Sequence, residues 1–235
     1  MKIAIKIFLT SLIFGAFAIE SQAQDWPNLN RYREENKAIM ETRHNDPNDA
    51  QKNWVVFMGN SITQNWASMD PDFFTENNYI GRGISGQTTP QMLIRFRQDV
   101  IQLNPKAVVI LAGTNDIAGN TGPSSIEMIM NNIMSMAELA QANNIKVVLC
   151  SLIPANRYSW APNVQPADTI IELNKRIEAY ARTKQMVYVD FYTPLVDNEK
   201  GLSSAYGKDG VHPTIEGYKV IEPLVIKGIE QAISR

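Results

Sequence analysis

The sequence predicts an α/β fold, a three-layer α/β/α sandwich built around a five-stranded parallel sheet. Five apolar runs of strand length recur along the chain, and segments with helical spacing of apolar residues lie between them. Two of these runs are continuous stretches without polar alternation, which is typical of parallel strands covered on both faces. The alternation of strands and helices implies right-handed crossovers between parallel strands.

The predicted strands cover residues 54–58, 79–84, 107–112, 146–152 and 186–191. The second is the weakest, because glycines interrupt it. Helices are expected at 89–103, 124–142, 167–183 and 214–233. Pro90 suits the first turn of the first of these helices, and Ser124 with Glu127 fits a capping box at the start of the second. The chain has 235 residues, 44% of them hydrophobic, which suits one globular domain over residues 24–235.

The first 23 residues have the pattern of a secretory signal peptide. Lys2 and Lys6 precede an apolar run at 7–19, and Ser21-Gln22-Ala23 places small residues where a signal peptidase cleaves. The run is shorter than the ~20 residues that a spanning helix needs. We therefore expect cleavage after Ala23, export to the periplasm or the extracellular space, and no stable membrane insertion after cleavage.

Charge and composition argue against several classes of partner. The chain carries 22 basic and 24 acidic residues and has no basic block, so nucleic acids and anionic membranes are poor candidates. The single cysteine, Cys150, cannot form an internal disulfide, and its apolar neighbours indicate a buried thiol. Two histidines and scattered acids provide no cluster of metal ligands, so we expect neither a metal nor a cofactor.

Polar or glycine-rich segments follow the predicted strands, at the edge where ligands bind in open parallel sheets. Ser61 follows the first strand, and a serine nucleophile needs an adjacent base. His212 lies three residues after Asp209, close enough for the carboxylate to orient the imidazole. Taken alone, this spacing also fits a capping aspartate beside a surface histidine. The other histidine, His44, lies in a polar segment that we expect to be solvated.

Acyl transfer also needs hydrogen-bond donors where negative charge develops on the substrate oxygen. The backbone N–H of Ser61 is one candidate, and Gly86 offers a second because a backbone without Cβ lets a ligand approach closely. The side-chain amide of Asn115 is a third. Glycine and asparagine are also ordinary turn residues, so each candidate is weak by itself. Their order along the chain, each at its own strand end, favours a common site.

These segments together resemble the SGNH, or GDSL-like, hydrolases. Gly59-Asn60-Ser61-Ile62-Thr63 looks like the first block of that family, residues 83–88 like the second, Gly113-Thr114-Asn115-Asp116 like the third and Asp209-Gly210-Val211-His212-Pro213 like the last. The resemblance implies a flavodoxin-like fold and metal-independent ester hydrolysis. It implies Ser61 as the nucleophile, His212 as the base and Asp209 as the residue that orients it. It also implies an oxyanion hole formed by the N–H groups of Ser61 and Gly86 and by Asn115. Asn60 departs from the usual first block, which has aspartate there, but this position is outside the triad.

The substrate is expected to be a small-molecule or oligosaccharide ester. No long apolar lid is visible, which favours a small acyl group such as acetyl. Arg157, Tyr158 and Trp160 follow the fourth strand and are predicted to contact substrate, the aromatic rings by stacking on a sugar; packing within the loop explains them equally well. The alternatives are a lysophospholipase or thioesterase, a non-catalytic carbohydrate-binding module on the same fold, and a metal-dependent phosphoesterase.

Overall fold

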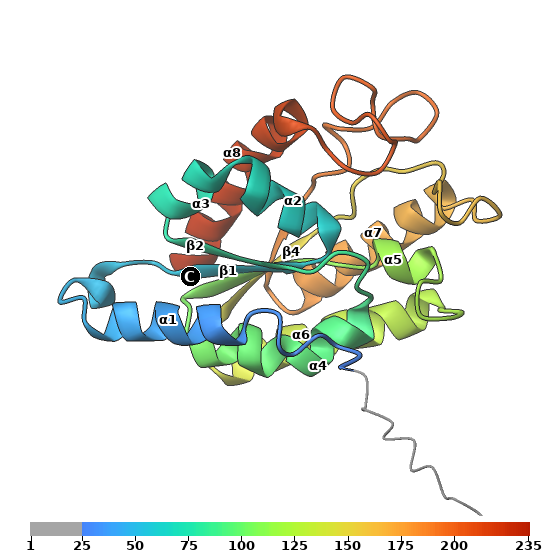
Figure 1. Cartoon of the computed structure of the whole chain (residues 1–235). Helices are drawn as coiled ribbons and strands as arrows, with labels where there is room; N and C mark the ends of the chain where they lie inside the picture. The colour runs from blue at the N-terminus through green and yellow to red at the C-terminus, as the bar shows by residue number, and fades with distance from the viewer. Residues whose placement is uncertain (1–24) are drawn as a thin grey trace, which may run out of the picture.

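The computed structural model describes residues 25–235, and the predicted signal peptide lies outside the described residues (Figure 1). Five parallel strands form one sheet in the order β2-β1-β3-β4-β5. Their bounds are β1 Val55–Gly59, β2 Tyr79–Gly83, β3 Ala107–Leu111, β4 Lys146–Cys150 and β5 Val187–Val189. The predicted parallel sheet is therefore confirmed. The strand order reverses direction between β1 and β3, and ligands bind at such switch points in doubly wound sheets.

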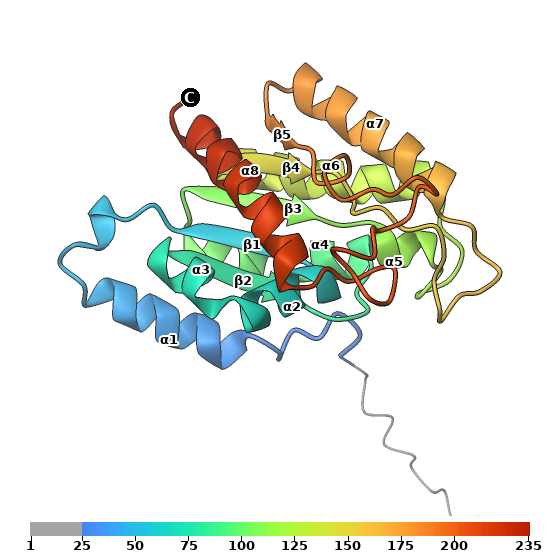
Figure 2. The same cartoon turned by 90° about the horizontal axis from the view of Figure 1, so that it is seen from above.

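Helices cover both faces of this sheet (Figures 1 and 2). One face is packed by the buried sides of α4 (Thr89–Asp99), α6 (Ile126–Ala142) and α7 (Ala167–Thr183). The other is packed by α2 (Ser61–Met69), α3 (Pro71–Glu76) and α8 (Ile215–Ile233). The remaining helices are α1 (Arg33–His44), which contacts α4, and the short α5 (Thr114–Ile117). Two 3-10 turns lie at Asp49–Gln51 and Ile101–Leu103.

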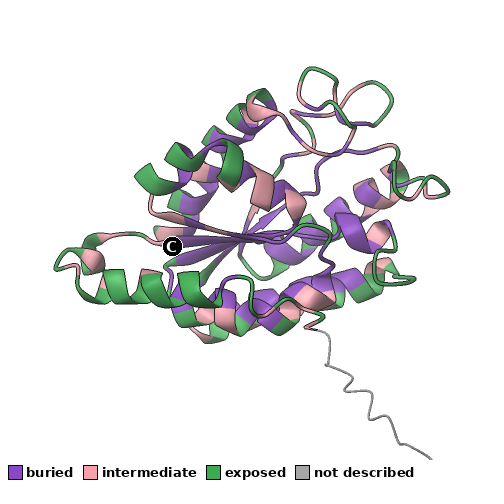
Figure 3. Ribbon diagram, viewed as in Figure 1, coloured by how far each residue is buried: buried purple, intermediate pink, exposed green. Residues whose placement is uncertain are grey.

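The core lies on both sides of the sheet, as the burial colours of Figure 3 show. Every residue of β1 and β3 is buried, which explains their continuous apolar sequence. Cys150, at the end of β4, is buried, as predicted, and this burial raises the pKa of its thiol. Trp66 of α2 is 1% exposed and stacks between Phe73 and Tyr218, so it joins α2, α3 and α8. Among the described residues, no helix combines the length and the apolar character needed to cross a membrane.

The four predicted helices exist, but several details differ from the prediction. The second begins at Ile126, and its N-cap is Ser125, whose Oγ accepts a hydrogen bond from the Met128 N–H. The predicted capping box at Ser124 is therefore wrong, because the N-cap is the next serine, and the residue three positions after it is Met128, which cannot complete a capping box. The first predicted helix ends at Asp99, and its last residues form the separate 3-10 turn.

The prediction includes none of α1, α2, α3 and α5. His44, expected in a solvated polar segment, is exposed as expected, but it is the last residue of the helix α1. That helix has only one buried residue, Asn36, so its sequence carries almost no apolar periodicity. The helices α3 and α5 have 6 and 4 residues, too few for a periodic pattern to emerge.

Gly83, the last residue of β2, touches the first turn of α2. A Cβ on Gly83 would lie 2.3 Å from Gln64 N and 2.5 Å from Asn60 O, which are backbone atoms that cannot rotate away. We therefore expect Gly83→Ala to destabilise the fold by about 2 kcal/mol through overpacking, which corresponds to a drop in Tm of roughly 4–8 °C for a chain of this size. Thermal unfolding followed by circular dichroism measures it. Ser68→Ala, an exposed change on α2, is the control, and an unchanged Tm for Gly83→Ala would contradict the close approach.

Candidate active site

The carboxyl ends of the strands bring three of the predicted site residues into hydrogen-bond contact. Ser61 Oγ lies 2.8 Å from His212 Nε2, and His212 Nδ1 lies 2.6 Å from Asp209 Oδ2. Ser61 and His212 are 151 positions apart in the sequence. The contact forms because the loop that precedes α8 returns over the start of α2 (Figure 2). This chain of contacts has the order required to remove a proton from a serine hydroxyl.

The turn from β1 into α2 fixes the position of Ser61. Ser61 is the first residue of α2, and the preceding Asn60 caps the helix by accepting a hydrogen bond from the Ile62 N–H at 3.0 Å. Asn60 therefore has a structural role that aspartate also fills, since both are strong N-caps. Tyr218 of α8 donates from its O–H to Ile62 O at 2.8 Å and ties the first turn of α2 to α8, which packs on the same face of the sheet.

Asp209 holds both the backbone and the ring of His212. Its Oδ1 accepts from the N–H groups of Val211 and His212, at 2.9 and 2.8 Å, while Oδ2 faces the ring. Burial alone would raise the pKa of the Asp209 carboxyl, but the hydrogen bonds from His212 and Val211 lower it below its ordinary value. The carboxylate is therefore ionised at neutral pH. It favours the imidazole tautomer with hydrogen on Nδ1, which leaves Nε2 free to accept the Ser61 proton.

The predicted oxyanion donors lie on the neighbouring loops. Asn115 is 4% exposed, and its Nδ2 donates to Gln87 O at 2.9 Å, which fixes the amide and leaves its second N–H. Gly86 has φ +76°, a backbone conformation that favours glycine. Within the described part of the chain, the N–H groups of Ser61 and Gly86 donate no hydrogen bond to protein. Free donors of this kind are what a developing oxyanion requires.

A buried polar network lies beneath these loops. Arg95 of α4 is fully buried and donates from Nη2 to the carbonyl oxygens of Gly59 and Arg82, at 3.0 and 2.9 Å. Its Nε reaches Gln87 Oε1 at 2.6 Å, and its charge is paired with Asp99 at 3.0 Å. One guanidinium thus joins the ends of β1 and β2 to the loop that Asn115 contacts. The sequence pattern offers no signal for this role, because Arg95 and Asp99 read as ordinary polar positions of an exposed helix face.

Asp116, in the short helix α5 that follows β3, fixes this part of the site to the start of α4. Its carboxylate accepts from the Thr89 N–H at 3.0 Å and from the Thr89 hydroxyl at 2.5 Å. Burial raises the pKa of Asp116, and the hydrogen bonds from Thr89 act in the opposite direction. Since Asp116 follows Asn115 directly, this contact helps to hold the amide in place.

The three predicted substrate contacts lie in different surroundings. Trp160 is 44% exposed, whereas Tyr158 is 1% exposed and stacks beneath it, with ring centroids 5.0 Å apart. Tyr158 therefore supports Trp160 from below. Arg157 is exposed and lies beside the loop of His212, with Nε 4.0 Å from the place where Gly210 would carry a Cβ. Their contact with substrate stays a prediction.

A cleft of about 570 Å³ adjoins one of the three predicted oxyanion donors. Gly86 is part of its wall, and so are Trp160 and Asn120. The other side of the wall includes Asp25 and Trp26, from the segment before α1. Asn120, Asp25 and Trp26 are not among the residues that the sequence pattern predicts, because nothing in the local sequence places them next to the site.

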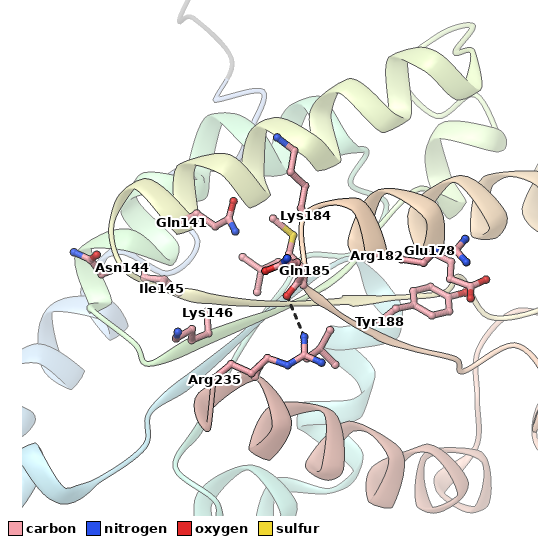
Figure 4. A pocket seen from close by; sticks show the side chains of 14 residues that line it. Gln141, Asn144, Ile145, Lys146, Glu178, Arg182, Lys184, Gln185, Tyr188 and Arg235 are labelled. Carbon is pink, nitrogen blue, oxygen red and sulfur yellow. Dashed lines mark hydrogen bonds between the residues drawn. The ribbon is translucent and has the colours of Figure 1, made fainter.

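A larger hollow of about 1060 Å³ lies at the opposite edge of the sheet, by the amino ends of β4 and β5 (Figure 4). Lys146, Arg182, Lys184 and Arg235 give it a basic lining, and Arg235 donates to Gln185 O at 3.0 Å. None of the predicted site residues lines it. Over residues 25–235, no three histidine, cysteine, aspartate or glutamate side chains are grouped so that they could hold a metal ion.

Comparison with solved structures gives two extensive matches. A GDSL-like lipase from Bacteroides thetaiotaomicron VPI-5482 is 49% identical, with a TM-score of 0.82 over 88% of this chain and 98% of its own. A candidate acylhydrolase from Bacteroides fragilis NCTC 9343 is 48% identical, with a TM-score of 0.84 over 90% of this chain and 100% of its own.

Sequence comparison agrees with these matches. The uncharacterized lipoprotein YqeF of Bacillus subtilis (strain 168) is 35% identical over 78 residues, which is 32% of either chain, so the match spans about a third of that curated relative. The model of the GDSL-like lipase/acylhydrolase family matches residues 57–220, most of the chain. The chain belongs to the GDSL-like lipase/acylhydrolase family and is a serine ester hydrolase.

Proposed function

We propose that the protein is an exported esterase that removes small acyl groups, acetyl above all, from carbohydrates through an acyl-enzyme on Ser61. The observation that carries this proposal is the hydrogen-bonded chain from Ser61 through His212 to Asp209. It lies at the strand ends, next to two backbone N–H groups that have no protein partner in the described chain. A nucleophile, a base and free donors are the parts that acyl transfer needs.

In the proposed mechanism, His212 Nε2 takes the Ser61 proton as Oγ attacks the ester carbonyl. The negative charge on the carbonyl oxygen is stabilised by the N–H groups of Ser61 and Gly86 and by the Asn115 amide. The helix α2 adds the positive end of its dipole at the same place, since Ser61 is its first residue. The protonated His212 then donates to the leaving alcohol, and water activated by the same imidazole hydrolyses the acyl-enzyme.

The character of the cleft supports a carbohydrate alcohol. Two partly exposed tryptophans, Trp26 and Trp160, share the wall of the cleft with the amides Asn120 and Gln91. An apolar channel for a long acyl chain would instead need a continuous aliphatic lining. This mixture of indole rings and amides suits a molecule with apolar faces and hydroxyl edges.

Asn115→Ala tests the oxyanion role. We expect kcat on p-nitrophenyl acetate to fall by about 100- to 1000-fold, the usual loss for one such donor, while KM changes little because the donor acts on charge that develops in the transition state. Steady-state kinetics measures both constants. Asn131→Ala, an exposed change on α6, is the matched control. A fall in kcat of less than threefold would remove Asn115 from the proposed mechanism.

Export is tested by the mass of the mature protein. If the signal peptide is cleaved after Ala23, protein recovered from the periplasm or the medium begins at Gln24 and lacks residues 1–23. Intact-mass spectrometry of the recovered protein measures this directly, with a chain that starts at Gln24 as the mass standard. Recovery of only the full-length chain, or of a chain modified with lipid, would contradict the proposal.

A further inference from the structure

The segment before α1 is fastened onto the loops of the candidate active site. Gln87 and Gln91 donate from their Nε2 atoms to the carbonyl oxygens of Pro27 and Trp26, each at 2.7 Å. Asp25 accepts from the N–H groups of Leu29 and Asn30, at 2.8 and 3.0 Å, which closes the segment into a turn. Trp26 is therefore held at the cleft although it lies outside residues 57–220, which the family model matches.

Trp160 is held on the same cleft by contacts of its own. Its indole Nε1 donates to Asn120 Oδ1 at 3.0 Å, and Tyr158 stacks beneath its ring. Asn120 Nδ2 in turn donates to Gly86 O at 3.1 Å. One amide therefore connects the exposed indole of Trp160 to a residue that we propose as an oxyanion donor.

The wall of the cleft carries only negative charge. Asp25 is the only charged residue in its wall, and no lysine or arginine lines it within the described chain. Hydrogen bonds from the Leu29 and Asn30 N–H groups lower the pKa of the Asp25 carboxyl, so it is ionised at neutral pH. A bound molecule with a carboxylate of its own would meet repulsion from Asp25 and no cation in the wall of the cleft; Arg33, whose charge also lowers the pKa of Asp25, lies outside that wall.

We propose that this cleft, the Trp26–Trp160 cleft, binds the sugar ring of a neutral O-acylated saccharide, and that Trp26 and Trp160 determine specificity for the alcohol half of the substrate. This inference rests on the proposed function and adds the subsite to it. The C–H faces of a pyranose pack on indole rings, which supply large rigid surfaces at little entropic cost. The amides of Asn120 and Gln91 each keep one N–H besides the one that donates to Gly86 O or Trp26 O, and these N–H groups serve the hydroxyl edges of the sugar. Asp25 disfavours acidic sugars.

Three acetate esters test the inference: a mono-O-acetylated methyl glucopyranoside, the matching glucuronide with the same acetyl position, and ethyl acetate, which has no ring. We expect the enzyme to prefer the neutral glycoside over the glucuronide by about tenfold. Trp26→Ala should lower kcat/KM for the glycoside about tenfold, mainly by raising KM, as expected for an aromatic anchor, and lower it much less for ethyl acetate. Trp26→Phe should recover most of the loss, because it restores an aromatic face.

Two controls separate the possible failures. Ile94→Ala changes an exposed residue of α4 outside the cleft. It should leave the ratio of kcat/KM for the glycoside to kcat/KM for ethyl acetate unchanged. Trp160→Ala tests the other indole. If Trp26→Ala does not fold, the effect of Trp160→Ala on the glycoside decides whether the cleft binds the sugar ring. Suppose that Ser61→Ala abolishes hydrolysis, but that kcat/KM falls by the same factor for the glycoside and for ethyl acetate in both tryptophan variants. The subsite is then overturned while the proposed function stands. A preference for the glucuronide also overturns it. Hydrolysis that survives Ser61→Ala overturns the proposed function itself.

Discussion

Ser61→Ala is expected to lower kcat for ester hydrolysis by about a millionfold, the loss seen when a serine nucleophile is removed from a working triad. The Oγ atom that lies 2.8 Å from His212 Nε2 is lost, so no acyl-enzyme can form. Binding should survive, because Ser61 keeps its backbone N–H at the start of α2. Steady-state kinetics on p-nitrophenyl acetate measures the rate, and mass spectrometry during turnover detects acyl-enzyme in the wild type alone.

Ser68→Ala provides a matched control on the same helix. Ser68 Oγ donates to Gln64 O at 3.1 Å and is exposed, so its removal should change neither kcat nor KM. A second test uses the double variant Ser61→Ala/Asp209→Asn. If the residues act as a unit, the double variant should be no slower than Ser61→Ala alone. Losses that multiply would mean that Asp209 acts on some step that does not involve Ser61.

The strands are predictable from sequence because each satisfies a strong local requirement. A central strand of a parallel sheet is apolar on both faces, so β3 and β4 stand out as continuous runs. The strand β2 contains two glycines, at 81 and 83, which are required by the close packing of β2 against α2. Added Cβ atoms would strike Ala67 Cβ and the backbone of the first turn of α2. The same packing that weakens the sequence pattern of β2 is what holds Ser61 in place.

The candidate triad is predictable for a different reason, which is topology. Parallel strands deliver all their carboxyl ends to one edge, so polar segments that follow separate strands are expected to meet there. That expectation brings Ser61 and His212 together without any information on side-chain contacts. It says nothing about which residues support them. The contacts of Arg95 with Gly59 O and Arg82 O, for example, depend on how α4 packs.

Of the wall of the cleft, the sequence predicts Gly86 and Trp160 as site residues but not the rest, because the contacts that hold the wall join distant segments. Trp26 is held by the amide of Gln91, 65 positions later, and Trp160 by the amide of Asn120, 40 positions earlier. Glutamine and asparagine carry no periodic signal that marks such contacts. The sequence does place aromatic residues after β4, but only the fold separates the exposed Trp160 from the buried Tyr158.

Asp209→Asn is expected to lower kcat by about 10,000-fold with little change in KM, the size of effect known for a triad aspartate. An asparagine oxygen can still accept from the N–H groups of Val211 and His212, so the loop should keep its shape. The amide NH₂ would then face His212 Nδ1 as a donor. This selects the tautomer with hydrogen on Nε2, which cannot accept a proton from Ser61.

Asp197→Asn is the matched control, because Asp197 lies in the same connection between β5 and α8. Its Oδ1 also accepts from two backbone N–H groups, those of Glu199 and Gly201 at 2.8 Å each, but it has no histidine beside it. We expect this variant to keep full activity. An equal loss in both variants would show that the loop's shape is what matters, and not the tautomer.

The pH dependence of stability gives Asp209 a readout that is independent of activity. The pKa of its carboxyl is lowered in the folded protein, so its contribution to stability is present above the ordinary aspartate pKa of ~3.9 and is lost as pH falls through the folded value. The Tm difference between wild type and Asp209→Asn should therefore be largest near neutral pH and shrink below about pH 4. A Tm difference that stays constant from pH 7 to pH 3 would mean that the carboxylate's charge has no part in holding His212.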